Sequence, residues 1–345
     1  MRVLVTGAFG NIGRSTLVEL LRQGQRVRCF DIRNRCNERA ARPFLGQVEV
    51  IWGDLRCPED IVAAVRDQQA VIHLAFIIPK LSSTGFESEE YPGWAREINV
   101  EGTRRLIEAM EAEPGSMKLL FASSYHIYGR TQDRTPPRTV TDPVHPIEHY
   151  SQHKVEAETL VRSSNLPWTI LRLAAALPVA MRLDPGMFDI PLENRMEYVH
   201  TQDVGLAFAN AVRHDSVWGK TLLIGGGPRC HYTYREITHQ VLEGMGVGML
   251  PEAAFSTTPF PTDWLDTVES QQLLQYQRYT LEDYVQDVKD QLGVRGHLIR
   301  VFRPLLRYLL LQQSLHYRAG RPGWLTAAFH GLKMLKGKPH GVRIG

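Results

Sequence analysis

The sequence has few cysteines and no long apolar run. Its four cysteines, Cys29, Cys36, Cys57 and Cys230, form no C-x-x-C pair and no metal-ligand spacing. We therefore expect free thiols in a reducing cytoplasm and no bound metal. No segment reaches the roughly 18 uninterrupted apolar residues that a membrane-spanning helix requires. The chain also lacks internal repeats, and its N-terminus resembles a core strand more than a signal peptide.

Acidic residues are missing from the last part of the chain. Residues 295–345 contain ten of the 40 Lys and Arg residues and no Asp or Glu, so residues 1–294 hold the other 30 and all 37 acidic residues. A basic tail thus follows an acidic body. The sequence pI of 8.6 is modest and no recognition motif accompanies the charge, so we expect no nucleic-acid partner.

The N-terminal segment has the pattern of a dinucleotide-binding loop. An apolar strand, Val3–Val5, leads into Gly7, Gly10 and Gly13, and helix-forming residues follow over 15–23. Such glycines permit a tight turn and a close approach of the backbone to a pyrophosphate, which then meets the N–H groups at the helix N-terminus. An acidic residue about 20 positions further on completes the pattern, and Asp31 is in this position.

Strand and helix patterns alternate through the first half of the chain, which predicts a doubly wound α/β fold of the Rossmann type with a parallel sheet. We expect strands at 2–6, 26–31, 48–52, 71–76, 118–123, 168–173, 198–200 and 221–224, with a loop after Asp31. The predicted organisation is a nucleotide-binding domain over 1–175, to which strands from about 198–226 return, then mainly a substrate lobe over 176–293 and a basic amphipathic helical tail over 294–345. Thr280 is expected to cap a helix over 281–292, with Asp283 three residues on.

Six motifs in this order resemble those of the extended short-chain dehydrogenase/reductase family, which includes NAD-dependent epimerases and dehydratases and 3β-hydroxysteroid dehydrogenases. They are TGAFGNIG (6–13), GDL (53–55), HLA (73–75), INVEGT (98–103), SSYHIYG (123–129) and YSQHK (150–154). The resemblance covers roughly residues 1–290. It implies a nicotinamide dinucleotide cofactor bound around the glycine loop, including Asn11 and Ile12.

Tyr150 and Lys154 are four residues apart, so a helix places them on one face. A neighbouring ammonium is expected to lower the pKa of the tyrosine, which could then exchange a proton with a substrate oxygen that Ser124 steadies. We prefer Ser124 over Ser123 because it occupies the family position. The resemblance also assigns Lys154 to the nicotinamide ribose. Asn99 resembles a family asparagine that kinks a helix and holds a water, although it could equally be a helix cap.

Asp31 can accept hydrogen bonds from both adenosine ribose hydroxyls and repel a 2′-phosphate, which favours NAD over NADP. Arg33 and Arg35 follow closely and could instead meet a phosphate. By the resemblance, Asp54 and Leu55 contact the adenine. Leu74 and Ala75 form the diphosphate and ribose wall, or are simply residues of a core strand.

The substrate region lacks polar groups. LRLAAALPVAM (171–181) contains no asparagine where sugar-nucleotide relatives usually have one, and HLAFIIP (73–79) is apolar. This favours an oxidoreductase acting at a hydroxyl or carbonyl carbon of a largely apolar substrate. A nucleotide-sugar epimerase or dehydratase remains an alternative, and a non-catalytic NAD-sensing module is a second one.

Two features concern partners. A helix over 98–112 and the helix that begins near Tyr150 correspond to the family's dimer-forming pair; Leu106, Ile107 and Met110 could serve such a homodimer or face the sheet.

In the tail, one helix is expected over 297–312, with Pro304 as a kink or a restart, and 324–336 repeats its pattern weakly. Its two faces could contact the inner face of a membrane or pack on the enzyme. The apolar face contains Leu298, Val301, Phe302, Leu305 and Leu309, and the opposite face Arg300, Arg303 and Arg307.

Overall fold

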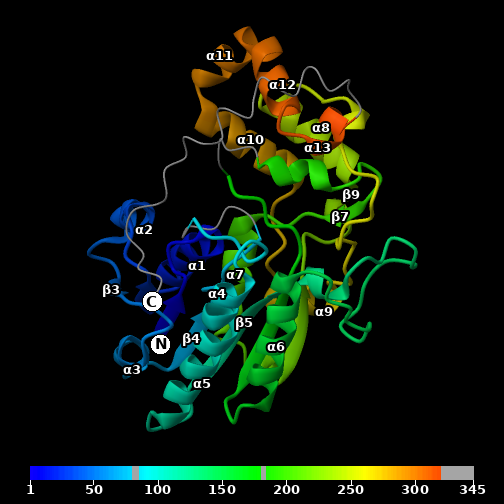
Figure 1. The fold of residues 1–345 in the computed structure, drawn as a ribbon. Helices are drawn as coiled ribbons and strands as arrows, with labels where there is room; N and C mark the ends of the chain where they lie inside the picture. The colour runs from blue at the N-terminus through cyan, green and yellow to red at the C-terminus, as the bar shows by residue number, and fades with distance from the viewer. Residues whose placement is uncertain (80–84, 180–183, 320–345) are drawn as a thin grey trace.

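The structure, a computed structural model, describes residues 1–79, 85–179 and 184–319. Its main element is a seven-stranded parallel sheet with the strand order β3-β2-β1-β4-β5-β6-β8 (Figure 1). This confirms the predicted doubly wound α/β fold. The strands are β1 (Arg2–Thr6), β2 (Arg26–Asp31), β3 (Glu49–Trp52), β4 (Ala70–His73), β5 (Lys118–Ser124), β6 (Trp168–Leu173) and β8 (Lys220–Ile224).

Helices cover both faces of this sheet, so its strands are buried on both sides. Successive side chains of β1 point to opposite faces: Val3 and Val5 enter one apolar cluster and Leu4 enters another. The first face is covered by α1 (Asn11–Arg22), α7 (Thr201–Ala211) and α9 (Val268–Leu274), and the second by α3 (Pro58–Val65), α5 (Gly102–Ala112) and α6 (His149–Ser163).

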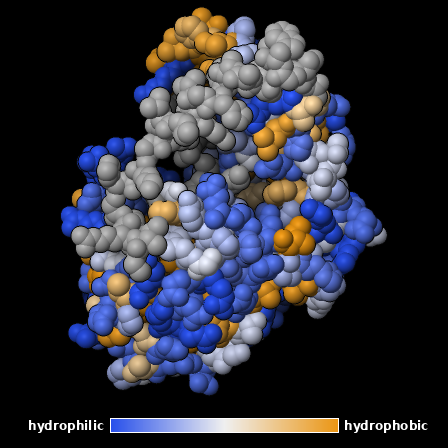
Figure 2. Space-filling model, in the orientation of Figure 1, coloured by the Kyte–Doolittle hydropathy of each residue, from blue (hydrophilic) through white to orange (hydrophobic). Residues whose placement is uncertain are grey.

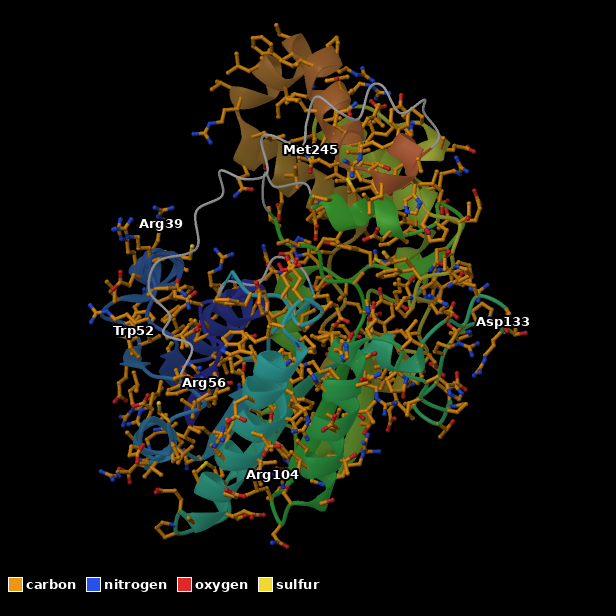
Figure 3. The ribbon with its side chains drawn as sticks, in the orientation of Figure 1. Arg39, Trp52, Arg56, Arg104, Asp133 and Met245 are labelled. Carbon is orange, nitrogen blue, oxygen red and sulfur yellow. The ribbon has the colours of Figure 1, made fainter. Side chains whose placement is uncertain are left out.

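A smaller lobe lies beyond the carboxyl end of the sheet, at the top of Figure 1. It contains the antiparallel pair β7 (Arg195–Glu197) and β9 (His231–Thr233), with α8 (Tyr234–Gly244) and α10 (Leu281–Leu292). Its own apolar core includes Tyr198, Ile237, Met245 and Tyr284; Figure 3 labels Met245 within this lobe. The predicted cap of α10 is confirmed, because Thr280 N donates to Asp283 Oδ2 at 2.8 Å.

One loop prediction and two strand predictions need correction. The segment after Asp31 contains a helix, α2 (Arg35–Ala41), because the Asn34 side chain accepts a hydrogen bond from Asn37 N at 2.9 Å and caps it. β4 ends at His73 and not at residue 76, since the N–H groups of the next two residues bond to Thr6 instead. The predicted strand over 198–200 is wrong as well: β7 ends at Glu197 and pairs with β9, so only β8 of the later strands returns to the main sheet.

The predicted helix over 98–112 is part of a longer helical segment. It begins with α4 (Pro92–Arg96), passes through a π-helical turn, Glu97–Glu101, and continues as α5. On α5, Leu106, Ile107 and Met110 are buried against the sheet. These three side chains therefore belong to the core of one subunit.

The C-terminal segment forms two short helices and not one. α11 (Arg295–Val301) ends at Phe302, and α12 (Arg303–Leu311) restarts there with Pro304 in its first turn, the position that proline tolerates best. α13 (Leu315–Ala319) follows. In the described part of the chain, no helix combines the length and the apolar character needed to cross a bilayer. The weaker repeat over 324–336 lies outside the described residues.

Candidate active site

The glycine loop connects β1 to α1 at the carboxyl edge of the sheet. Gly7 has a φ of +64°, and a Cβ there would lie 2.7 Å from Ala75 N. A Cβ on Gly13 would lie 2.3 Å from Gly7 O. Both positions therefore exclude a side chain. Gly10 is the residue before α1, so the free N–H groups of that helix open onto the loop.

A cavity of about 870 Å³ lies beside this loop. Its walls come from the glycine loop (Gly10 and Asn11), from α2 (Asn37) and from α10 of the smaller lobe (Asp287). Asn11 Nδ2 also donates to Ala176 O at 3.3 Å, which links the loop to the chain that enters the smaller lobe. Ile12, in contrast, packs against the apolar core. The cavity thus runs between the two lobes at the N-terminus of α1.

Asp31 lies at the end of β2 with its carboxylate against the same loop. Oδ2 accepts from Phe9 N at 2.9 Å, and Oδ1 accepts from Ile32 N and from Asn37 Nδ2, each at 2.9 Å. Burial raises the pKa of Asp31 to about 6, although the two backbone hydrogen bonds act to lower it. A carboxylate has about four acceptor positions, so it can still accept from a ribose hydroxyl.

The remaining residues predicted at the adenosine end differ in surroundings. Arg33 is exposed, and its Nε donates to Glu38 Oε1 at 2.9 Å. Asp54 is held by Arg56 at 2.7 Å; burial would raise the pKa of this carboxyl, but the hydrogen bonds and charge of Arg56 lower it overall. Figure 3 labels Arg56 near the β3 edge of the sheet. Leu55 is buried in the core below.

Leu74 and Ala75 leave β4 directly beside Gly7. Both of their N–H groups donate to Thr6 Oγ1 at 3.2 Å. The same hydroxyl lies 2.7 Å from His73 Nδ1, and the other ring nitrogen lies 2.9 Å from Thr103 Oγ1 on α5. Burial lowers the pKa of His73 to about 3, so the ring is neutral and structural. These bonds hold the end of β4 against the glycine loop.

Asn99 lies inside the π-helical turn, so the alternative that it caps a helix is wrong. Its Oδ1 accepts from Ile77 N at 2.6 Å and its Nδ2 donates to Ile77 O at 3.0 Å. The side chain thus acts like a strand partner for the loop that follows β4. It positions the apolar residues of that loop near the N-terminal end of α6.

The structure brings Ser124 and Tyr150 together. Ser124 is the last residue of β5, where its Oγ accepts from His126 N at 3.3 Å, and its side chain interacts with Tyr150 in the first turn of α6. Ser123 is buried one residue earlier in the strand. Burial raises the pKa of Tyr150 to about 12, while the interaction with the Ser124 side chain acts to lower it. The expectation that Lys154 lowers this pKa is therefore not met in this arrangement.

Lys154 lies one turn along α6, on the same side as Tyr150 as predicted. Its Nζ donates to Ala122 O at 2.6 Å and lies 3.4 Å from the centre of the Phe76 ring and 5.7 Å from that of Tyr150. Burial lowers the pKa of this amine well below its usual range, with Glu158 acting weakly in the opposite sense. The carbonyl and the ring face are the contacts that favour its charged form.

A buried ion pair fixes α6 on the sheet. Arg172 on β6 donates from Nε and Nη2 to the two carboxylate oxygens of Glu158 at 3.0 and 2.8 Å, and from Nη1 to Tyr128 Oη at 2.7 Å. Arg162 also reaches Glu158 at 2.8 Å. These bonds hold the helix that carries Tyr150 in register with the end of β5.

One pair of side chains beside Tyr150 was not predicted. His126 Nδ1 lies 2.9 Å from Glu148 Oε2, and the His126 ring meets that of Tyr150 edge-on at 6.0 Å between centres. Phe260 packs edge-on against the other side at 5.5 Å. His126 lies in the turn after β5, and Glu148 is the residue before α6. Their only sequence signal is the histidine inside SSYHIYG.

Comparisons with known proteins agree with this architecture. The profile of the NAD dependent epimerase/dehydratase family matches residues 3–177. A 3-beta-hydroxysteroid dehydrogenase of Mycolicibacterium neoaurum is 30% identical over 169 residues, which are 48% of this chain and 43% of that protein. The UDP-glucose 4-epimerase of Bacillus subtilis is 33% identical over 222 residues, 59% of this chain and 62% of that protein. The chain thus spans about half the length of the curated relatives it matches.

Two solved structures share the fold. A short-chain dehydrogenase/reductase superfamily protein from Agrobacterium tumefaciens with bound NAD has a TM-score of 0.67 at 22% identity, covering 88% of this chain and 100% of that one. A UDP-glucose-4-epimerase from Stenotrophomonas maltophila with NAD and a formylated UDP-arabinopyranose has 0.69 at 22% identity, covering 86% and 99%. The family profile, which spans half of the chain, confirms the resemblance: this chain belongs to the NAD dependent epimerase/dehydratase family.

Proposed function

We propose that this protein is an NAD-dependent oxidoreductase that acts at a hydroxyl or carbonyl carbon of a largely apolar substrate. The observation that carries the proposal is the placement of Ser124 and Tyr150 beside each other at the carboxyl edge of the sheet, with Lys154 one helical turn behind. When bound, NAD accepts or supplies a hydride. The residues fit this cofactor: the glycine loop permits a close approach, the N-terminus of α1 is open beside a cavity, and the Asp31 carboxylate lies against the same loop.

Each catalytic residue has a distinct role. Tyr150 exchanges the proton of the substrate hydroxyl, and Ser124 steadies the same oxygen as charge develops on it. With a pKa of about 12, Tyr150 carries its proton at neutral pH and is ready to donate it to a carbonyl. Lys154 would bind the nicotinamide ribose, and only its charged form would lower the pKa of the tyrosine. The cofactor contacts are those expected from the sequence: the glycine loop with Asn11, the carboxylates of Asp31 and Asp54, and the wall of Leu74 and Ala75.

The surroundings of Tyr150 support an apolar substrate. Phe76 meets the Tyr150 ring edge-on at 5.8 Å between centres, and Phe260 closes the side next to His126. The chain leaving β6 continues through Ala174, Ala175 and Ala176, none of which offers a side-chain anchor for a diphosphate. A pocket lined by aromatic and aliphatic side chains favours an apolar substrate, because the free energy gained on binding grows with the apolar area that is buried.

A second candidate is dehydration or epimerisation of a nucleotide sugar, and one observation favours it. Hydride exchange needs one residue that moves the proton of the hydroxyl group. Dehydration also needs a second residue that moves a proton at a neighbouring carbon. His126, oriented by Glu148 and adjacent to Tyr150, has the chemistry for this second transfer. The B. subtilis and S. maltophila proteins are named UDP-glucose 4-epimerases, which supports the same alternative.

A thermal-shift screen in the presence of NAD distinguishes the oxidoreductase from the nucleotide-sugar epimerase or dehydratase. Hydrophobic secondary alcohols and ketones should raise the melting temperature, and UDP- and dTDP-sugars should not. Strong stabilisation by a nucleotide diphosphate sugar would reverse the choice. His126→Asn should then abolish dehydration while leaving NAD reduction measurable. If NAD shifts the melting temperature but no alcohol, ketone or sugar is turned over, the protein is an NAD-sensing module.

We also propose that the enzyme is a cytoplasmic homodimer with peripheral contact to the inner face of a membrane. The dimer would use the outer faces of α5 and α6, which lie side by side on one face of the sheet (Figure 1). Since the apolar residues of α5 face inward, exposed polar groups such as Arg104 and Glu108 would form much of the contact. A monomeric mass by light scattering at micromolar concentration would contradict the dimer.

A further inference from the structure

The two helices α11 and α12 carry a continuous apolar surface on the side away from the enzyme. We call Leu298, Val301, Phe302, Leu305 and Leu309 the outer apolar face. Val301 is 71% exposed, Leu298 59% and Phe302 54%. Figure 2 shows hydrophobic atoms gathered at the top of the molecule, where α11 and α12 lie in Figure 1.

The outer apolar face is not the side by which these helices pack on the lobe. Two arginines of α12 reach toward the smaller lobe, on the same side as Leu310 and Leu311. Arg303 Nε donates to Val247 O at 2.9 Å, and Arg307 Nη1 donates to Gly248 O at 2.8 Å and to Met249 O at 2.6 Å. These carbonyls follow α8 in the smaller lobe. Arg303 and Arg307 thus bind backbone carbonyls of the protein.

Further contacts lock the helices in this orientation. Leu311 at the end of α12 is buried in the core of the smaller lobe, with Ile299 and Leu310 packed around it. Ser314 Oγ then donates to Ala254 O at 2.6 Å. Turning the outer apolar face inward would break the arginine bonds to three carbonyls. Because a charge-assisted hydrogen bond is about twice as strong as a neutral one, the exposed leucines are a stable feature of this lobe.

The charges next to this face indicate what covers it. Arg295 and Arg300 on α11 are exposed, and residues 295–345 contain ten Lys and Arg but no Asp or Glu. An apolar helix face with a cationic border, and with Phe302 and Tyr308 exposed on it, matches the boundary between acyl chains and anionic headgroups.

We propose that the outer apolar face docks on an anionic lipid surface. Phe302, Leu305 and their neighbours would enter the acyl boundary, and Arg295 and Arg300 would contact phosphates. Each basic residue near such a surface raises partitioning by about fivefold at low salt. The proposal is independent of the hydride chemistry, because the surface lies on helices that contribute no residue to the catalytic set.

The test is flotation of the full-length protein with vesicles of phosphatidylcholine alone and of phosphatidylcholine mixed with phosphatidylglycerol. Wild type should float with the anionic vesicles at low salt and much less with the neutral ones. The double variant Phe302→Asp/Leu305→Asp should lose at least about tenfold in bound fraction. Its thermal unfolding and NAD binding should not change, since both side chains are exposed.

A matched control is Leu45→Asp, which alters an equally exposed apolar side chain (62%) on the nucleotide-binding domain. This variant should float like wild type. Three results would overturn the proposal. The first is a wild-type protein that stays unbound on anionic vesicles at low salt, and the second is a double variant that binds as wild type does. The third is a concentration-dependent dimer that the double variant abolishes, which would make the face a contact between two copies of the chain.

Discussion

The ion pair between Arg172 and Glu158 offers a quantitative test of how the active-site helix is held. Arg172→Met removes the guanidinium but leaves the Glu158 carboxylate buried, with Arg162 as its remaining partner at 2.8 Å. Breaking a buried pair by removing one partner costs about 3–5 kcal/mol. Because Arg162 remains, we expect the lower end, about 3 kcal/mol. With an unfolding entropy of about 2.1 cal/mol/K per residue, a chain of 345 residues should melt about 4 °C lower.

Calorimetry of three variants makes this result specific. The double variant Glu158→Leu/Arg172→Met removes both charges and should regain most of the lost stability, since apolar replacement of a buried pair is often neutral. Arg96→Met breaks the exposed pair with Glu156 at 2.6 Å and should cost less than about 1 kcal/mol. A melting temperature of Arg172→Met within about 1 °C of wild type, or a double variant less stable than the single one, would refute the reasoning.

The pH dependence of the same pair has a definite sign. Burial acts to raise the pKa of Glu158, but the hydrogen bonds and charge of Arg172 outweigh it and lower that pKa overall. The stabilisation is therefore present above the ordinary pKa of a glutamate and is lost as the pH falls through the lowered one. The difference in stability between wild type and Arg172→Met should accordingly shrink in acid.

Two further predictions concern the cofactor. Gly13→Ala should weaken NADH binding by at least about tenfold in a fluorescence titration, because its Cβ would lie 2.3 Å from Gly7 O; Gly93→Ala, where a Cβ would meet nothing within 4 Å, should bind normally, and equal affinities would contradict the close approach. Burial raises the pKa of Asp31 to about 6, so only about one tenth of the Asp31 side chains are ionised at pH 5. The apparent Kd for NAD should therefore rise about tenfold between pH 8 and pH 5. Over the same window the free protein should lose stability as the pH rises through about 6, because burial disfavours the charged form; an Asp31→Asn variant should show neither trend.

Local patterns in the sequence explain why much of the fold could be predicted. The glycine loop and the buried strands are read from residues close together in the chain, and Tyr150 and Lys154 share a side of α6 because four residues make about one turn. Helix α2 was missed because a loop was inferred from the end of β2, although Asn34 is a good capping residue.

Other features depend on contacts between distant segments. The pair of His126 and Glu148 joins a turn to a helix cap 22 residues later, and no spacing rule identifies it. The amphipathic pattern of the C-terminal helices correctly placed Leu298, Leu305 and Leu309 on a face apart from Arg303 and Arg307. It could not say which face turns inward, because that depends on the carbonyls that the end of α8 presents to Arg303 and Arg307. Likewise, spacing did not reveal that Lys154 would contact Phe76 and a backbone carbonyl.

The central claim is that Tyr150 moves a proton at the substrate oxygen while the bound NAD exchanges a hydride. The most direct measurement is the absorbance of NADH at 340 nm in wild type and Tyr150→Phe, with the alcohol that stabilises the NAD-bound protein most. We expect Tyr150→Phe to lower turnover by about 10² or more, with the Kd for NAD unchanged within about twofold. Near-normal turnover in this variant, with NAD bound, would contradict the account.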